Sequence, residues 1–145
     1  MAFGLDQTTK IIVDRLMIPG ESTPVINGAV YMTYAQNSGA AFGLFPDRTS
    51  FFVVVTVAVI ALLFLIYHRA GRQVPWLSVS LGLQVGGALG NFVDRVRLGY
   101  VIDFIDLRFW PIFNLADVAI VIGVLLLAVT VFGQSEAGSE HEHEW

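Results

Sequence analysis

The chain has 145 residues, of which 55% are hydrophobic and only 14% are charged, and its mean hydropathy is +0.69. Soluble domains carry about 25% charged residues, so this composition excludes an ordinary soluble domain and predicts membrane-spanning helices. Four of the 12 acidic residues lie between Gln134 and Trp145, and the rest of the chain is neutral. This balance excludes the basic surface of a nucleic-acid-binding protein. The absence of cysteine excludes disulfides and thiolate chemistry.

The first segment, Met1–Ile18, is apolar but is interrupted by charged residues, including Asp6 and Lys10. It lacks the basic start and the small-residue cleavage site of a signal peptide. We interpret it as the second half of a membrane span whose first half is missing.

A small β-hairpin is predicted next. Pro19-Gly20 and Pro24 end any helix. Asn27-Gly28 then lies between β-prone residues, and this dipeptide favours a two-residue turn with positive φ at both positions. We therefore expect a hairpin on the membrane surface, followed by a loop of small residues over Asn37–Gly43.

Three apolar runs predict transmembrane helices, because a span needs about 20 mostly apolar residues. They cover Phe51–Tyr67, Trp76–Val93 and Phe109–Phe132. Glycines recur every four residues in the second run, at Gly82, Gly86 and Gly90, a spacing typical of closely packed membrane helices. We expect one transmembrane domain over residues 1–133 and an acidic disordered tail over residues 134–145.

Polar residues gather at one end of the second and third runs. Asn91 and Asp94 are three residues apart, as are Asn114 and Asp117, so each pair shares a helix face. The connecting segment is predicted to be a loop that contains Asp103 and Asp106. Asp117 lies inside the third run, where an ionisable side chain is costly and indicates function. The alternative for Asp117 is an acidic residue that complements the dipole of a first helical turn.

Two carboxylates held together share a proton, because one pKa rises. Such a pair activates water and protonates a leaving amine, as in aspartic proteases. The histidines, His68, His141 and His143, lie elsewhere in the sequence, so a serine–histidine arrangement is excluded at this end. The His141–Glu144 segment is interpreted as a solvated tail rather than a metal site.

Five segments resemble the motifs of one family, the bacterial lipoprotein signal peptidases (signal peptidase II). The family's blocks are similar to the following segments of this sequence: Asp6-Gln-Thr-Thr-Lys10, Asn37-Ser-Gly39-Ala-Ala-Phe42, Asn91-Phe-Val-Asp94-Arg95, Val-Ile-Asp103-Phe-Ile-Asp106 and Phe-Asn114-Leu-Ala-Asp117. The resemblance implies an all-α four-helix transmembrane bundle, here with a shortened first helix, and a small extramembrane β-cradle. It implies a location in the bacterial cytoplasmic (inner) membrane with the active site at the outer face.

The resemblance also implies roles for individual residues. Asp103 and Asp117 match the catalytic aspartate pair. The supporting or substrate-binding positions of the family match Asp6, Lys10, Asn37, Gly87, Asn91, Asp94, Arg95 and Asn114. The implied reaction is cleavage of a prolipoprotein before its diacylglyceryl-modified cysteine, without a metal or other cofactor. The implied partners are that substrate, membrane lipid and globomycin-type inhibitors, and no nucleic acid.

Three further expectations remain at this point. Gly86, Gly87 and Gly90 are expected to leave room for the lipidated cysteine. A count of Lys and Arg alone predicts the opposite orientation in the membrane. Two alternative functions are a small proton- or ion-conducting membrane protein and a non-catalytic relative of the peptidase.

Overall fold

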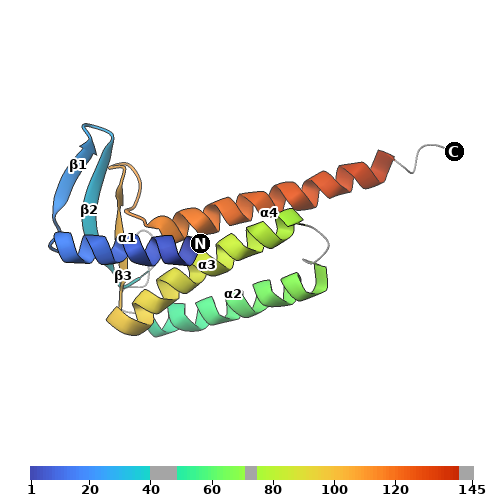
Figure 1. Ribbon diagram of the computed structural model, residues 1–145, viewed down its shortest axis with the longest axis horizontal. Coiled ribbons are helices and arrows are strands. Elements are labelled where there is room, and N and C mark those ends of the chain that lie inside the picture. The colour runs from blue at the N-terminus through green and yellow to red at the C-terminus, as the bar shows by residue number, and fades with distance from the viewer. Residues whose placement is uncertain (40–48, 71–74, 141–145) are drawn as a thin grey trace.

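The computed structural model describes residues 1–39, 49–70 and 75–140, which form four helices and one three-stranded sheet. The elements in chain order are α1 (Ala2–Leu16), β1 (Ser22–Ile26), β2 (Val30–Asn37), α2 (Thr49–Ala70), α3 (Pro75–Leu98), β3 (Val101–Asp106) and α4 (Leu115–Glu140). The sheet lies at one end of the helices, and α2, α3 and α4 extend away from it (Figure 1). The prediction of a mostly helical chain with a small sheet is confirmed. Residues 40–43 of the expected small-residue loop lie outside the described residues.

Glycines on α3 allow its neighbours to approach closely. A Cβ atom on Gly87 would overlap the carbonyl oxygen of Ala116 on α4, and one on Gly90 would overlap the carboxylate of Asp6 on α1. The space beside Gly86 is filled by Ala2 of α1. The packing interpretation is therefore confirmed for Gly86 and Gly90, but it is wrong for Gly82, where an added Cβ would meet no atom within 4 Å. The expectation that Gly86, Gly87 and Gly90 leave room for a lipidated cysteine is wrong, because α1 and α4 occupy that space.

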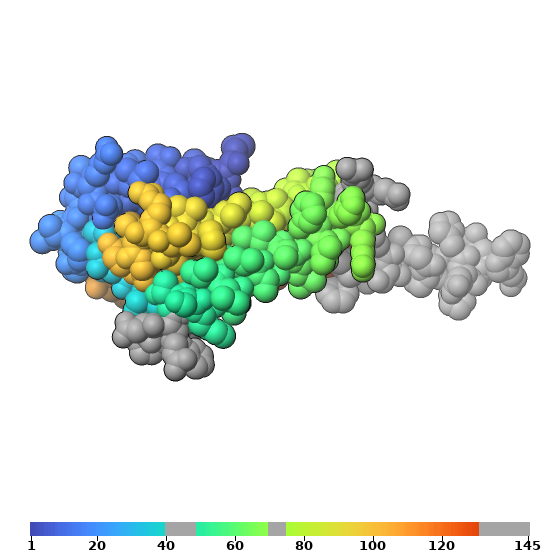
Figure 2. Space-filling model, turned by 90° about the horizontal axis from the view of Figure 1, so that it is seen from below, coloured from blue at the N-terminus to red at the C-terminus, as the bar shows by residue number. Residues whose placement is uncertain are grey.

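Within the described ranges, α2 is the one helix that is long and apolar enough to cross a membrane by length and composition, over Thr49–Arg69. Its apolar side chains mostly point outward, as those of a lipid-facing helix do. α4 contains a shorter apolar stretch, Leu115–Thr130. Figure 2 shows α1, α2 and α3 side by side on one face of an elongated molecule.

The predicted start of the third span is wrong. α4 starts at Leu115 rather than Phe109, because Pro111 interrupts the backbone hydrogen bonding and Asn114 caps the helix. At its other end α4 continues to Glu140, into the segment predicted to be a disordered tail. The rest of that tail, residues 141–145, lies outside the described residues.

The sheet has the order β1-β2-β3, and both pairs of strands are antiparallel. The predicted hairpin is confirmed, with Ile26 opposite Val30 across the turn. The turn differs from the predicted type, because only Gly28 has a positive φ, of 79°. Asn27 needs no left-handed conformation, since three residues rather than two connect the strands.

The segment expected to be a loop over Asp103 and Asp106 is strand β3. Its side chains alternate between two buried faces. Ile102 and Phe104 pack with Val13 of α1 and Tyr34 of β2. The opposite face places Asp103 toward the ends of α3 and α4, so the sheet carries one of the two candidate catalytic carboxylates.

Candidate active site

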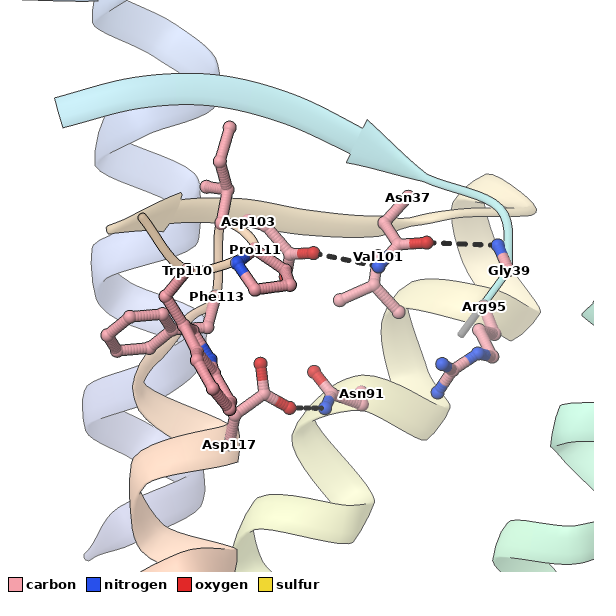
Figure 3. Close-up of a pocket in the computed structure, with 11 residues that line it drawn as sticks. Asn37, Gly39, Asn91, Arg95, Val101, Asp103, Trp110, Pro111, Phe113 and Asp117 are labelled. Atoms are coloured by element: carbon pink, nitrogen blue, oxygen red, sulfur yellow. Dashed lines mark hydrogen bonds between the residues drawn. The ribbon is translucent and has the colours of Figure 1, made fainter. Parts of the chain in front are cut away.

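A pocket of about 240 Å³ opens where the sheet meets α3 and α4. It is lined by Asn37, Gly39, Asn91, Arg95, Val101, Asp103, Trp110, Pro111, Ile112, Phe113 and Asp117. Figure 3 shows Asp103 and Asp117 inside this pocket, with Trp110 and Phe113 on one side and Asn91 and Arg95 on the other. The structure thus brings together residues from five separate segments of the sequence.

Asp103 is held in place on β3 by two amides. Its side chain is almost fully buried, at 3% exposure. Asn37 Nδ2 donates to its Oδ2 at 3.0 Å, and Asn114 Nδ2 donates to its Oδ1 at 2.7 Å. Asn37 is itself fixed, because its Oδ1 accepts the backbone N–H of Gly39.

Asp117 lies in the first turn of α4 and forms a reciprocal cap with Asn114. The Asp117 N–H donates to Asn114 Oδ1, and the Asn114 N–H donates to Asp117 Oδ2, each at 3.1 Å. This arrangement is a capping box. The first-turn interpretation of Asp117 is therefore confirmed, and the same residue lines the pocket.

Asn114 connects the two aspartates physically. It is fully buried, at 0% exposure. Its Oδ1 accepts a hydrogen bond from the Asp117 N–H. Its Nδ2 donates to Asp103 Oδ1 and, at 3.0 Å, to Asn91 Oδ1. One side chain therefore fixes the relative position of β3, the end of α3 and the start of α4.

Asn91 links Asp117 to a buried lysine. Its Nδ2 donates to Asp117 Oδ1 at 2.9 Å, and its Oδ1 accepts from Lys10 Nζ at 2.9 Å. Because Lys10 has only donor hydrogens, it forces the Asn91 oxygen toward itself. The Asn91 amide group is then directed at Asp117.

Lys10 sits between two carboxylates behind the pocket. Its Nζ lies 2.9 Å from Asp6 and 2.8 Å from Asp94, and it is only 1% exposed. Asp94 also accepts from the backbone N–H of Ile102, and Asp6 accepts from the N–H of Ala116. The ion pair with Asp94 and these hydrogen bonds together tie α1 to α3, β3 and α4.

Burial raises the pKa of Asp103 to about 7, and repulsion from Asp117 adds to this increase. The hydrogen bonds from Asn37 and Asn114 and the charge of Lys10 lower the pKa but do not compensate for burial. Near neutral pH, Asp103 is therefore partly protonated beside a second carboxyl group. One site then offers a proton donor and a proton acceptor, which is what hydrolysis of an amide needs.

The predicted site residues fall into two groups. Five line the pocket, namely Asn37, Asn91, Arg95, Asp103 and Asp117. The guanidinium of Arg95 also lies over the ring of Phe52 on α2, at 5.2 Å. The remaining five are not among the lining residues: Asp6, Lys10, Asp94 and Asn114 bond to one another or to the residues of the pocket, and Gly87 packs against α4.

Sequence reasoning missed the residues on one side of the pocket, from Trp110 to Phe113. It read them as the start of a transmembrane run. Pro111 and the Asn114 cap were the available signals that this segment is not helical. Asp106 was grouped with Asp103 in sequence, but the structure separates them, since Asp106 bonds Thr33 and Arg108 at the far end of β3.

Comparison with known proteins identifies the family. A family model described as signal peptidase (SPase) II matches residues 1–133. The chain belongs to the signal peptidase II family. It is 49% identical to the lipoprotein signal peptidase of Pelotomaculum thermopropionicum, over 97% of this chain and 92% of that one. It is 48% identical to that of Halothermothrix orenii, over 92% of each chain.

Solved structures agree with this assignment. A bacterial membrane enzyme determined by the in meso method at 2.3 Å resolution has a TM-score of 0.88 and 34% identity, over 92% of this chain and 84% of that one. A second, at 1.9 Å resolution, has a TM-score of 0.82 and 36% identity, over 90% and 86%. Signal peptidase II enzymes are aspartic proteases of bacterial membranes that remove signal peptides from prolipoproteins.

Proposed function

We propose that this signal peptidase II family member cleaves prolipoproteins before a diacylglyceryl-modified cysteine, with Asp103 and Asp117 as its catalytic pair. The observation that carries this proposal is the shared pocket of the two aspartates, which Asn114 joins through hydrogen bonds to both. The alternative of an ion-conducting protein has no comparable support, because the charged side chains of the site gather at one end of the helices.

The environments of the two aspartates suggest different roles. Asp117 lies at the start of α4, where it accepts hydrogen bonds from the Asn91 amide and from the backbone N–H of Asn114. Asp103 is buried and has a pKa of about 7, which favours its carboxylic acid form below that pH. Asp117 is therefore the general base of the proposed reaction, and Asp103 is the general acid.

The proposed reaction needs one water molecule. Asp117 removes a proton as the water oxygen attacks the carbonyl carbon of the scissile peptide bond. Asp103 then donates its proton to the nitrogen, and the carbon–nitrogen bond breaks. The products are a signal peptide with a new carboxyl group and a lipoprotein with a free amino group. Asp117 then passes its acquired proton to Asp103, directly or through solvent, which restores the starting state.

We propose a multi-pass arrangement in the bacterial cytoplasmic membrane, with α2, α3 and α4 crossing it and the sheet at the outer face. The sheet and the pocket lie at one end of these helices (Figure 1). A site at the membrane surface receives a substrate that is anchored in lipid. The apolar surfaces beside the pocket, including one lined by Phe109, Val118 and Val121, fit a lipid-bearing substrate.

The lipid requirement provides the test of the proposed function. Each buried CH₂ of an acyl chain contributes about 0.8 kcal/mol, so two acyl chains localise a substrate far better than a short peptide does. The 145-residue protein in detergent is incubated with two forms of one prolipoprotein, one that carries the diacylglyceryl group and one that lacks it. Cleavage is followed by gel shift. We expect cleavage of the modified form alone. Equal cleavage of both forms would indicate a general aspartic protease, and cleavage of neither would refute the proposed function.

The protonation of Asp103 predicts the pH dependence of cleavage. A general acid with a pKa of about 7 loses its proton as the pH rises, so kcat/KM should decline above about pH 7. Replacing Asn37 with alanine removes a hydrogen bond that lowers this pKa, so the decline should move to higher pH. Rates of cleavage between about pH 5 and pH 9 check both statements. A rise in activity through pH 7 would instead assign the role of base to Asp103.

A further inference from the structure

A ring of hydrogen bonds encloses the end of β3 that lies away from Asp103. The Arg108 guanidinium donates to Ser22 Oγ at 2.8 Å. Ser22 and Thr33 hydroxyls lie 2.7 Å apart, and Thr33 donates to Asp106 Oδ2 at 2.7 Å. Asp106 Oδ1 accepts the backbone N–H of Arg108 at 2.8 Å, which closes the ring. The ring thereby connects all three strands to the residue that follows β3 by two positions.

Two further contacts hold Arg108 itself. Its guanidinium lies over the ring of Tyr31, 3.7 Å from the centroid. This is a short cation–π distance. A second guanidinium nitrogen lies 3.5 Å from Asp106 Oδ2. The hydrogen bonds from Thr33 and Arg108 and the charge of Arg108 outweigh burial and lower the pKa of Asp106, so this carboxylate stays ionised at neutral pH.

The backbone at Arg108 supports a positional role. Its φ is 69°, and among the described residues it is the one non-glycine residue with a positive φ. Side chains other than glycine avoid this left-handed conformation unless the surroundings impose it. The ring of hydrogen bonds imposes it here, and the chain therefore turns back after β3.

The segment after Arg108 forms one side of the pocket. Ile105 and Phe113 are paired through backbone hydrogen bonds in both directions, at 2.8 and 3.1 Å. The intervening loop is therefore closed at its base, and Arg108 fixes its first half. Trp110 and Pro111, further along the loop, line the pocket that contains Asp103 and Asp117. Trp110 also borders the apolar surface beside Asp117 (Figure 3).

We propose that Arg108 is a positioning residue for substrate binding. It holds the 107–113 loop in the position in which Trp110 lines one side of the catalytic pocket. Arg108 is half-exposed and is not among the residues that line the pocket, so it acts on the substrate only through the loop. This proposal rests on the proposed function for its kinetic readout but not for its spectroscopic one.

The experiment compares variants that open the ring with variants that keep it. Arg108→Asn removes the guanidinium but keeps a residue that tolerates a positive φ. Tyr31→Leu removes the aromatic face, whereas Tyr31→Phe retains it. Arg97→Gln is the matched control, because it removes an exposed arginine near the end of α3. KM and kcat are measured with the lipidated prolipoprotein. Steady-state anisotropy of Trp110 is measured after Trp76 and Trp145 are replaced with phenylalanine.

We expect Arg108→Asn and Tyr31→Leu to raise KM by about three- to tenfold, the cost of ordering a released side chain at a binding site, with kcat within about twofold of the parent. Trp110 anisotropy should fall in the same two variants. Tyr31→Phe should keep the KM and the Trp110 anisotropy of the parent, and Arg97→Gln should change neither. Unchanged KM and anisotropy in both ring-opening variants would overturn the proposal, as would a fall in kcat with KM unaffected. A parent enzyme that does not cleave the substrate would refute the proposed function, while the anisotropy would still decide the role of Arg108.

Discussion

Replacing Asp103 with asparagine is expected to lower the rate of prolipoprotein cleavage by about 10²- to 10⁴-fold, the usual contribution of a general acid or base. An amide of the same shape cannot donate a proton to the leaving nitrogen. Asp117→Asn is expected to lower the rate to a similar extent, because it cannot accept a proton from water. The measurement is a gel-shift assay with the lipidated substrate. Near-parental turnover in either variant would remove that residue from the mechanism.

The effect of Asp103→Asn on stability distinguishes loss of chemistry from loss of fold. The folded-state pKa of Asp103 is raised from 3.8 to about 7, so the folded protein binds this proton more tightly than the unfolded chain does. Its contribution to the free energy of unfolding therefore falls as the pH rises from about 4 to about 7. Above that range, the folded protein bears the full cost of burying the ionised carboxylate. Asp103→Asn removes this dependence. Between about pH 5 and pH 8, its Tm should decline less than that of the parent. An equal or steeper decline would contradict the burial argument.

Replacing Lys10 with methionine is expected to be the most damaging single change to the fold. The substitution leaves Asp6 and Asp94 buried without their cation. Breaking a buried ion pair in this way costs about 3–5 kcal/mol. For a chain of this size that cost lowers Tm by about 10 °C. Thermal unfolding of the purified protein in detergent measures the change.

Two comparisons make this test specific. Arg15→Met removes an exposed basic residue from the same helix and should leave Tm nearly unchanged. Combining Lys10→Met with Asp6→Asn neutralises one of the two abandoned carboxylates and should recover part of the lost stability. If the Tm of the Lys10→Met variant lies within about 2 °C of the Tm of the parent, the buried cation is not what holds α1 against α3.

The helices of the three long apolar runs were predictable from the sequence, because each run has more consecutive apolar residues than a soluble domain usually buries in one segment. Their ends were harder to predict. Hydropathy does not distinguish Phe109 and Trp110 in a loop from the same residues in a span, so α4 was predicted to start six residues early. The deciding factors were local, namely the proline at Pro111 and the cap formed by Asn114.

Strand β3 was missed for a different reason. Its six residues are buried on both faces, so the polar and apolar residues do not alternate as they do on a half-exposed strand. Its pairing with β2 involves residues more than 60 positions away, which no local pattern reports. The asparagines and aspartates of the candidate site were nevertheless predicted, because Asn–Asp spacing on two helices and the family motifs are both visible without knowledge of this strand.

The position of Asn114 has a consequence for how the enzyme becomes competent. Its amide spans the two aspartates and caps α4 at the same time, so the pair is assembled when the first turn of that helix forms. The separation of the carboxylates is then a product of folding rather than of substrate binding, and the site is preorganised. The energy of binding a lipoprotein need not be spent on bringing the proposed acid and base together, and remains available for distorting the peptide bond that is cut.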